Sequence, residues 1–381
     1  MDYIKRAEEI SGQIVADRRH LHQNPEFGME LPNTCAFVRS RLEKMGYTVS
    51  DCGGGLTVTI GKGGKCVLLR ADMDALKLTE ENNLPYRSTN GYAHMCGHDM
   101  HTAILLGAAK LLRECESELG GTVKLMFQPG EEVMRGAQSM IDAGVLENPH
   151  VDAALGLHVM THIANGKLSV RPSAAFAGID IFRYEVKGTG GHGSALEMTV
   201  DPIHALVQVY NALESIVPRE SSMFDSVSCS VGHIEGGTMY NIIPSSAMLE
   251  GTLRFFNNSA HERIAERMQR IADGVALATG TKCSVSHQSL PALVNDSALC
   301  AALEGVFGSI PGLEFSVADA PLNASEDFAL VAERVPAVFL MLGVGVDGGV
   351  TNHNPSAVFY DDKLYLASAM LAKAAAAYLS M

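Results

Sequence analysis

The feature that most constrains the fold is an alternation of short aliphatic or β-branched runs with longer runs at helical spacing. After two helical stretches at the start of the chain, the sequence predicts strands 66–70, 122–127 and 151–159, alternating with helices 99–117 and 133–145. Short apolar runs between helices are typical of strands that are buried on both faces. The sequence therefore predicts an α/β domain whose largely parallel sheet is covered by helices on both sides.

Near residue 178 the order of the predicted elements changes to β-α-β-β-α-β. The predicted elements are strand 179–187, helix 201–217, strands 226–235 and 246–256, helix 259–279 and strand 282–287. This order fits a small two-layer domain. The α/β rhythm then resumes with helix 296–308, strand 337–344 and helix 361–380. We therefore predict a discontinuous domain of residues 1–177 plus 292–381, interrupted by a domain of residues 178–291.

Composition narrows the functional class. The chain has 381 residues, a net charge of −14 and 47% hydrophobic residues, which excludes disordered and collagen-like proteins. The acidic balance and the lack of Lys/Arg runs argue against a nucleic-acid partner.

The first residues show no apolar signal core, and stretches such as 335–346 are shorter than the ~20 residues of a membrane span. We expect a cytoplasmic protein without a membrane partner, whose eight cysteines are mostly buried free thiols.

Polar clusters follow the predicted strands, where open α/β sheets bind their ligands. The clusters are Asp72 and Asp74, Glu131 and Glu132, His158, His353, and the helix entrance Cys96-Gly97-His98. Thiolate, imidazole and carboxylate are zinc ligands, so five such segments at one rim predict a metal site. Gly97 would let its two neighbours reach one ion. His94 and His101 compete as ligands, but no glycine helps to aim them.

Each cluster also has a purely structural interpretation. Cys96 alone could be a small buried residue, and two glutamates could complement a helix dipole. Asp74 could orient a ligating imidazole or form a turn. The adjacent glutamates allow a division of labour, in which one binds metal while the other takes a proton from water and passes it to a leaving amine.

Three further candidates lie in the smaller domain. His192 follows a glycine-rich segment, 188–191, that does not match a dinucleotide motif and suits presentation at a cleft or subunit interface. Asn241 and Arg254 could hold a carboxylate, Arg254 through a bidentate pair. A structural role explains each of the three equally well.

Taken together, the motifs resemble the amidohydrolase branch of the aminoacylase and glutamate-carboxypeptidase family of metallopeptidases, which includes hippurate hydrolases, auxin-amino-acid-conjugate hydrolases and N-acyl-amino-acid deacylases. The motifs are RADMDAL (70–76), CGHDMHT (96–102), QPGEE (128–132), the histidine of LHV (157–159), GGHGS (190–194), NIIP (241–244), SEDFA (325–329) and HNP (353–355). The resemblance implies a two-metal hydrolase domain with an inserted ferredoxin-like lid that also forms a homodimer.

The resemblance also implies roles for individual residues. The implied metal ligands are Cys96, His98, Glu132, His158 and His353, with Cys96 where related branches have a bridging aspartate. Glu131 resembles the catalytic acid and base, and Asp74 resembles a carboxylate that supports the metal site. His192, Asn241 and Arg254 resemble lid residues that contact substrate, and His192 resembles a residue that acts on the neighbouring subunit.

The sequence thus predicts a metal-dependent amidohydrolase that cleaves N-acyl amino acids such as N-acetyl or N-benzoyl compounds. We expect two divalent ions, zinc foremost, with manganese, cobalt and nickel as alternatives. One alternative is a dipeptidase or carboxypeptidase of the same family. Two others are a thiol amidase with Cys96 as nucleophile and a metal-binding scaffold without activity.

Overall fold

The computed structural model describes residues 1–222 and 224–381, which divide into two compact units. The first unit comprises Met1–Ala175, Val294–Pro321 and Asp327–Met381, and the second comprises Phe176–Leu293 and Leu322–Glu326. The chain crosses from one unit to the other within the short strands β7 (Ala174–Phe176) and β14 (Leu293–Val294), and again on either side of Leu322–Glu326. Each unit is described by itself below.

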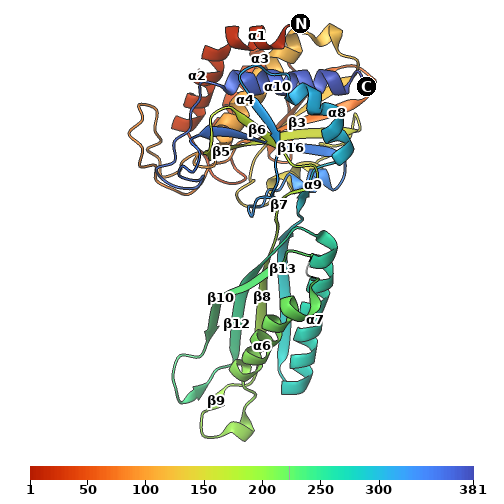
Figure 1. Ribbon diagram of the computed structural model, residues 1–381. Helices are drawn as coiled ribbons and strands as arrows, with labels where there is room; N and C mark the ends of the chain where they lie inside the picture. Colours follow the sequence, from red (N-terminus) through yellow and green to blue (C-terminus); the bar gives the residue numbers. More distant parts are fainter. Residues whose placement is uncertain (223) are drawn as a thin grey trace. The chain divides into compact units, whose positions relative to one another are not determined.

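The first unit is built on an eight-stranded sheet of order β1-β2-β4-β3-β5-β16-β6-β15 (Figure 1). Its strands are β1 (Ser50–Cys52), β2 (Gly55–Gly61), β3 (Cys66–Asp72), β4 (Thr122–Gln128), β5 (Ala153–Ala164), β6 (Lys167–Val170), β15 (Glu314–Val317) and β16 (Ala337–Gly345). Every residue of β3, β4 and β16 is buried, as expected for strands covered on both faces. The predicted α/β class is confirmed.

The sheet is mixed, and the expected parallel pairing holds for its central strands and for the β6–β15 pair. The central strands β4, β3, β5 and β16 are parallel, but β2 runs antiparallel to β4 and β6 antiparallel to β16. Strand β1 pairs with β2 across the two-residue turn Gly53-Gly54, whose φ angles of 55° and 89° suit a hairpin. Strands β1 and β6, of three and four residues, are too short to carry the apolar runs that predict the central strands.

Helices cover both faces of this sheet. They are α1 (Tyr3–Glu9), α2 (Ser11–Gln23), α3 (Pro32–Lys44), α4 (His98–Glu114), the 3₁₀ turn η1 (Glu116–Glu118), α5 (Gly136–Asp142), α8 (Ser297–Phe307), α9 (Ala329–Ala332) and α10 (Leu364–Tyr378). Helices α4 and α10 pack on one face, where α1, α2 and α8 extend the layer, and α5 and α9 pack together against β4 and β16. Among the described helices, none is long and apolar enough to cross a membrane.

The second unit is a two-layer structure with the chain order β-α-β-β-α-β. Its main elements are β8 (Gly178–Lys187), α6 (Pro202–Glu220), β10 (Ser228–Gly236), β12 (Ser246–Phe255), α7 (Asn258–Thr279) and β13 (Lys282–Leu290). The antiparallel sheet has the order β10-β12-β8-β13, and α6 and α7 pack together against it. Beyond one end lie β9 (Gly191–His192), the 3₁₀ turn η2 (Leu196–Met198) and β11 (Ile242–Ile243). The observed order is that of a ferredoxin-like fold.

Candidate metal centre

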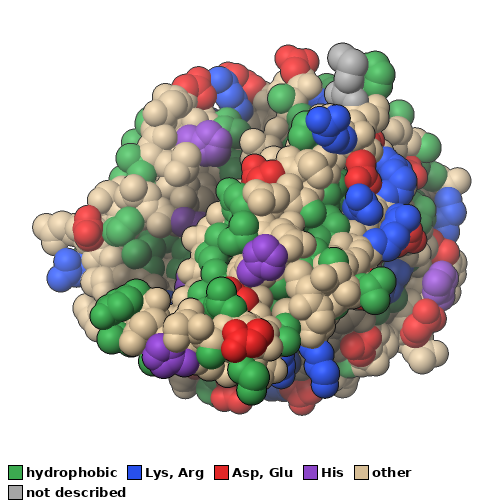
Figure 2. All heavy atoms as spheres, turned by 90° about the horizontal axis from the view of Figure 1, so that it is seen from below, with side chains coloured by type: hydrophobic (Ala, Val, Ile, Leu, Met, Phe, Trp, Pro, Cys, Tyr) green, Lys and Arg blue, Asp and Glu red, His purple; other side chains and the backbone are tan. Residues whose placement is uncertain are grey.

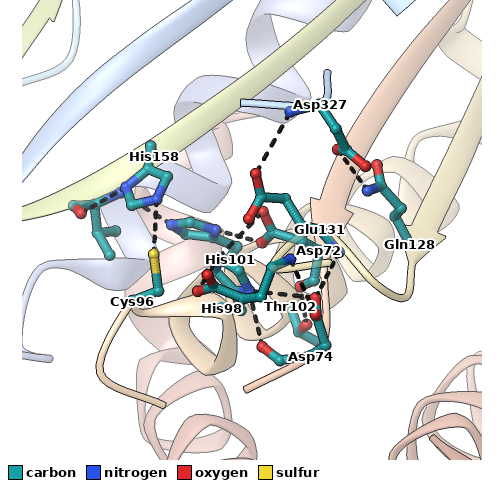
Figure 3. Close-up of polar contacts among 12 residues, drawn as sticks. Asp72, Asp74, Cys96, His98, His101, Thr102, Gln128, Glu131, His158 and Asp327 are labelled. Atoms are coloured by element: carbon teal, nitrogen blue, oxygen red, sulfur yellow. Dashed lines mark hydrogen bonds and ion pairs between the residues drawn. The ribbon is translucent and has the colours of Figure 1, made fainter. Parts of the chain in front are cut away.

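The first unit gathers sulfur, imidazole and carboxylate side chains near the carboxyl ends of β3 and β4 and beside the middle of β5, where His158 lies within the strand and not after it as the sequence suggested. The predicted ligands come from separate segments: Cys96 and His98 from the start of α4, Glu132 from the loop after β4, His158 from β5 and His353 from the segment after β16. In Figure 3 the side chains of Cys96 and His158 point toward one another, with His98 beside them. The fold thus brings together residues that are up to 257 positions apart in the chain.

Gly97 shapes the entrance to α4. Its φ of 99° lies in the region that disfavours side chains, and a Cβ atom there would lie 2.3 Å from Cγ2 of Val159. Only glycine fits this backbone, which turns so that Cys96 and His98 both lie buried on either side of it. The glycine that the sequence analysis expected to permit close approach is therefore required by both conformation and space.

Two sets of donor atoms share the Cys96 thiol. Sγ of Cys96 lies 3.3 Å from Nε2 of His158 and 3.2 Å from Nε2 of His353. Nε2 of His353 lies 3.5 Å from Oε1 of Glu132, which in turn lies 3.9 Å from Nε2 of His98. The donors of Cys96, His98 and His158 lie within 4.8 Å of one another, and so do those of Cys96, Glu132 and His353. A shared thiol between two triads is an arrangement for two neighbouring ions.

The unpaired atoms of this cluster fit divalent cations. The His98 Nδ1–H donates to the Asp74 carbonyl at 2.8 Å, which leaves Nε2 facing the cluster. Nε2 of His98 and Oε1 of Glu132 are buried and have no hydrogen-bond partner among the described residues. Unpaired buried polar atoms are costly, and metal coordination would satisfy both.

The electrostatics of the cluster also favour positive charge. Burial raises the pKa of Glu132 to about 7, although His98 opposes the shift, and burial raises the pKa of the Cys96 thiol well above its usual value. Burial by itself would lower the pKa of His98, but Asp72 and Cys96 raise it well above its usual value. Divalent ions would supply the missing positive charge and hold the thiol and carboxyl as anions.

The competing histidines are placed differently. His101 is engaged at both ring nitrogens: Nδ1 lies 2.6 Å from Oδ1 of Asp72, and Nε2 accepts the Val159 N–H at 2.9 Å. His101 therefore uses its lone pair within the protein. His94 is buried, burial lowers its pKa to about 3, and it belongs to none of the donor sets found among the described residues.

Asp74 supports the site in a way that the sequence did not indicate. Its carboxylate oxygens accept the backbone N–H groups of Glu131 and Glu132 at 3.0 and 3.1 Å. The carbonyl of Asp74, rather than its carboxylate, accepts the His98 proton, since the carboxylate lies 3.6 Å from Nδ1. Asp74 thereby fixes the backbone from which both glutamate side chains leave.

Arg70, Gln128 and Asp327 are buried polar residues beside the site that received no individual role from the sequence, and buried Asp72 was expected only as a member of the polar cluster 72–74. The Arg70 guanidinium donates to Asp72 at 2.8 Å, to Gln128 at 2.9 Å and to Asp327 at 3.0 Å. Burial alone would raise the pKa of Asp72, but Arg70 and the nearby imidazoles lower it well below its usual value. In the sequence, the feature that could have pointed to such residues is a polar side chain at the end of an otherwise apolar strand.

The second unit separates its three candidates. His192 in β9 pairs with Ile242 of β11, and Gly193 donates to the Asn241 carbonyl at 2.9 Å, so His192 and Asn241 are neighbours at one end. Arg254 in β12 pairs with Ile179 at the other end of the sheet. Nη1 of Arg254 is buried without a hydrogen-bond partner among the described residues, and burial lowers its pKa. At ~3.3 Å per residue, the length of β12 separates the two positions by over ~25 Å.

Comparison with known proteins agrees with this chemistry. The model of peptidase family M20/M25/M40 matches residues 68–377. The chain is 39% identical over 340 residues to IAA-amino acid hydrolase ILR1-like 4 of Arabidopsis thaliana, covering 87% of this chain and 77% of the relative. It is 35% identical to N-acetyl-L-cysteine deacetylase of Bacillus subtilis (96% and 88% covered) and to hippurate hydrolase of Campylobacter jejuni (100% of both).

A solved structure is also similar. The crystal structure of a Bacillus subtilis protein, described as a dinuclear metal binding peptidase from the M20 family, matches with a TM-score of 0.83 and 30% identity. The match covers 98% of this chain and 99% of that chain. The family resemblance carried by the motifs is thereby confirmed, and the chain belongs to peptidase family M20/M25/M40.

Proposed function

We propose that this chain is a metal-dependent amidohydrolase that cleaves the amide bond of N-acyl amino acids. The observation that carries the proposal is the pair of donor triads that share Cys96, with Glu131 beside them. The donor atoms of Glu131, Glu132 and His98 lie within 4.8 Å of one another, so Glu131 can face a reacting group while Glu132 serves as a ligand. Relatives named as hydrolases of N-acyl amino acids support this substrate class.

Cys96, His98, Glu132, His158 and His353 would hold two divalent ions. When bound, such ions supply an activated water nucleophile and polarise a carbonyl oxygen. Glu131 removes a proton from the attacking water and delivers it to the departing amine nitrogen. Asp74 keeps Glu131 in place through the backbone N–H that it accepts.

His192 has the hydrogen-bonding state needed to stabilise a developing oxyanion. Its Nδ1 accepts the Ser194 N–H at 3.2 Å, so the proton lies on Nε2 and can be donated to a carbonyl oxygen. A donor of this kind typically contributes ~10²- to 10³-fold in rate. Arg254 and Asn241 are proposed to bind the substrate carboxylate, and the buried unpaired Nη1 of Arg254 supports such a partner.

We further infer a homodimer in which the second unit acts as lid and dimerisation domain. His192 and Arg254 lie at opposite ends of one sheet, so a compact substrate cannot contact both residues of the same subunit. In the proposed dimer, one subunit supplies His192 to the substrate and the other supplies Arg254. Apolar side chains are exposed around His192: Leu196, Met198 and Tyr240 are 61%, 73% and 97% exposed. Figure 2 shows one face of the structure, on which hydrophobic side chains lie among acidic and histidine residues. Such surfaces suit a protein partner.

Zinc is the proposed metal, because one thiolate, three imidazoles and a carboxylate match its ligand preferences, with manganese, cobalt or nickel as alternatives. We propose a cytoplasmic location, where reduced thiols such as Cys96 persist. The net charge of −14 supports small-molecule substrates over nucleic acid.

The alternative thiol mechanism has weaker support. A nucleophilic cysteine needs a lowered pKa, whereas burial raises the pKa of Cys96. An inactive metal-binding scaffold has no need for the acid Glu131 next to the ligands. A dipeptidase or carboxypeptidase of the same family would share the whole site and differ in its substrate.

A substrate panel separates these functions. Purified protein is assayed with N-acetyl and N-benzoyl amino acids, with dipeptides, and after treatment with a chelator or with iodoacetamide. We expect hydrolysis of N-acyl amino acids that chelator abolishes and added metal restores. Turnover of dipeptides alone would make the chain a dipeptidase. Inactivation by iodoacetamide together with indifference to chelator would favour the thiol mechanism.

A further inference from the structure

The motif SEDFA (325–329) places a buried aspartate beside the loop that carries Glu131. The Asp327 carboxylate accepts hydrogen bonds from the Gln128 amide at 2.7 Å, from Arg70 at 3.0 Å and from the Ala137 backbone N–H at 2.9 Å. Its own backbone N–H donates to Oε1 of Glu131 at 3.4 Å. Figure 3 shows Asp327 between Gln128 and Glu131, linked to each.

The loop from residue 129 to 136 closes tightly between these anchors. Gln128 is the last residue of β4 before the loop, and Ala137 follows it in α5, so one carboxylate holds both ends. Within the loop, the N–H groups of residues 135 and 136 both reach the Gly130 carbonyl at 3.1 Å. Met134 has a φ of 55°, a conformation that is unfavourable for a non-glycine residue and persists only when its surroundings impose it.

Arg70 makes the burial of this carboxylate favourable. The side chains of Arg70 and Asp327 are both fully buried, and an unpaired charge at such a depth would be costly. Arg70 also donates to Asp72 and to the Gln128 carbonyl oxygen, so the guanidinium fixes the same strand end from which the loop departs. The network therefore has the rigidity to hold a side chain at a set position.

We propose that Asp327 is a positioning residue for Glu131, with Arg70 as its counter-charge and Gln128 as its link to β4. Asp327 clamps the two ends of the 129–136 loop and aims the Glu131 carboxylate through a backbone hydrogen bond. It acts on the reaction only through Glu131, and the inference rests on the proposed catalytic role of Glu131. A displacement of ~1 Å in such a group can reduce the rate ~10²-fold.

A double-mutant cycle tests this coupling. Asp327→Asn keeps the size of the side chain but cannot accept all three hydrogen bonds. We expect it to lower kcat for an N-acyl amino acid about 10- to 100-fold with KM and metal content unchanged, and to change kcat less than about threefold in a Glu131→Gln background. Equal losses in both backgrounds, or no loss in either, would overturn the proposal.

The matched control is Asp17→Asn. Asp17 is also buried and also pairs with one arginine and one glutamine, Arg41 at 3.1 Å and Gln13 at 2.9 Å, but it belongs to α2. We expect this variant to keep kcat. If Asp327→Asn fails to fold, Gln128→Met removes one link of the clamp at similar volume and should show the same background dependence with a smaller loss of kcat.

A readout that does not depend on activity separates this inference from the proposed function. Amide hydrogen exchange in residues 130–137 of the metal-free protein should become at least about tenfold faster in Asp327→Asn and stay unchanged in Asp17→Asn. Unchanged exchange in the loop would overturn the clamp even if the wild-type enzyme is active. Absence of N-acyl hydrolysis by the wild type, with the exchange effect present, would instead overturn the proposed function.

Discussion

At the scale of single residues, the site assigns different work to side chains of the same type. Glu132 faces the cluster of Cys96 and His353, whereas Oε1 of Glu131 accepts a hydrogen bond from the Asp327 backbone. His98 keeps a buried nitrogen for which residues 1–222 and 224–381 offer no hydrogen-bond partner, whereas His101 has both nitrogens engaged. A donor atom that already has a hydrogen-bond partner supports the site, whereas a donor atom that is left without one is available to bind a metal ion.

Removal of the Glu131 carboxylate should separate catalysis from metal binding. Glu131→Gln preserves shape but cannot accept and return a proton, so we expect kcat to fall about 10²- to 10⁴-fold. Metal content, measured by elemental analysis, should stay at the wild-type level because Glu131 lies outside both triads that share Cys96. Turnover close to that of the wild type would remove Glu131 from its catalytic role.

Cys96 should matter to both ions at once. Since its Sγ belongs to both triads, we expect Cys96→Ala to weaken metal binding at both positions and to abolish the rise in melting temperature on zinc addition. The control is Cys66→Ala, which removes a buried thiol from β3 outside the triads. A Cys96→Ala protein that still binds two equivalents of metal would contradict the shared-ligand arrangement.

At the scale of secondary-structure elements, the start of α4 depends on Gly97. We expect Gly97→Ala to lower the free energy of unfolding of the metal-free protein by about 1–3 kcal/mol, because of its positive φ and the contact with Val159. Thermal and denaturant unfolding measure the change. Gly274→Ala in α7, where no atom lies within 4 Å of the added Cβ, should instead stabilise the protein by up to about 1 kcal/mol. Equal effects would contradict this account.

Helix α2 is tied to α4 by a buried histidine. His22 contacts Asp99 at 2.8 Å and Glu80 at 3.2 Å. Burial lowers the pKa of His22, but the two carboxylates outweigh both burial and the Arg18 charge and raise it. A raised pKa stabilises the fold fully below the unfolded value of ~6.5, and this stabilisation is lost as the pH rises through the folded value.

The raised pKa of His22 determines how the free energy of unfolding should change with pH. Between pH 6 and 9, the metal-free wild type should lose more stability than His22→Gln, as measured by denaturant unfolding at each pH. His150→Gln, which changes an exposed histidine, should follow the wild-type curve. Parallel curves for the wild type and His22→Gln would show that folding leaves the pKa of His22 unchanged and would contradict this prediction.

The elements also show what the sequence could predict. The predicted strands 66–70, 122–127 and 337–344 match β3, β4 and β16 because residues buried on both faces form continuous apolar runs. The predicted helix 133–145 is shorter in the structure, Gly136–Asp142, because the clamped loop occupies its beginning. Strands β1, β6 and β15, of three or four residues each, carry too few side chains to show a period.

The site was predictable in its residue types but less so in its contacts. Five ligand-like residues stand out because they follow strands or open a helix. The residues that support these ligands do not stand out in the sequence. The hydrogen bond from Asp327 to Glu131, for example, joins segments 196 residues apart, and no local pattern encodes such a contact. The carbonyl of Asp74, which accepts the His98 proton, is likewise invisible in a side-chain pattern.

At the scale of the whole molecule, the proposed homodimer predicts that His192 of one subunit acts at the site of the other. A mixture of inactive Glu131→Gln and His192→Ala proteins tests this prediction. If His192 acts across a dimer, half of the protomers after random exchange lie in mixed dimers with one intact site each, giving about a quarter of wild-type activity. If His192 acts within its own subunit, every site carries one substitution and the mixture stays inactive. Size-exclusion chromatography with light scattering verifies the dimer and the exchange.

The central claim is that the Cys96 cluster binds two ions on which hydrolysis depends. The most direct measurement is the metal content of protein purified without chelator, determined by elemental analysis and compared with N-acyl amino acid hydrolysis before stripping, after stripping and after zinc is returned. We expect about two equivalents of metal per chain, and activity that disappears and returns with them. Protein without metal that hydrolyses its substrate regardless of chelator would contradict it.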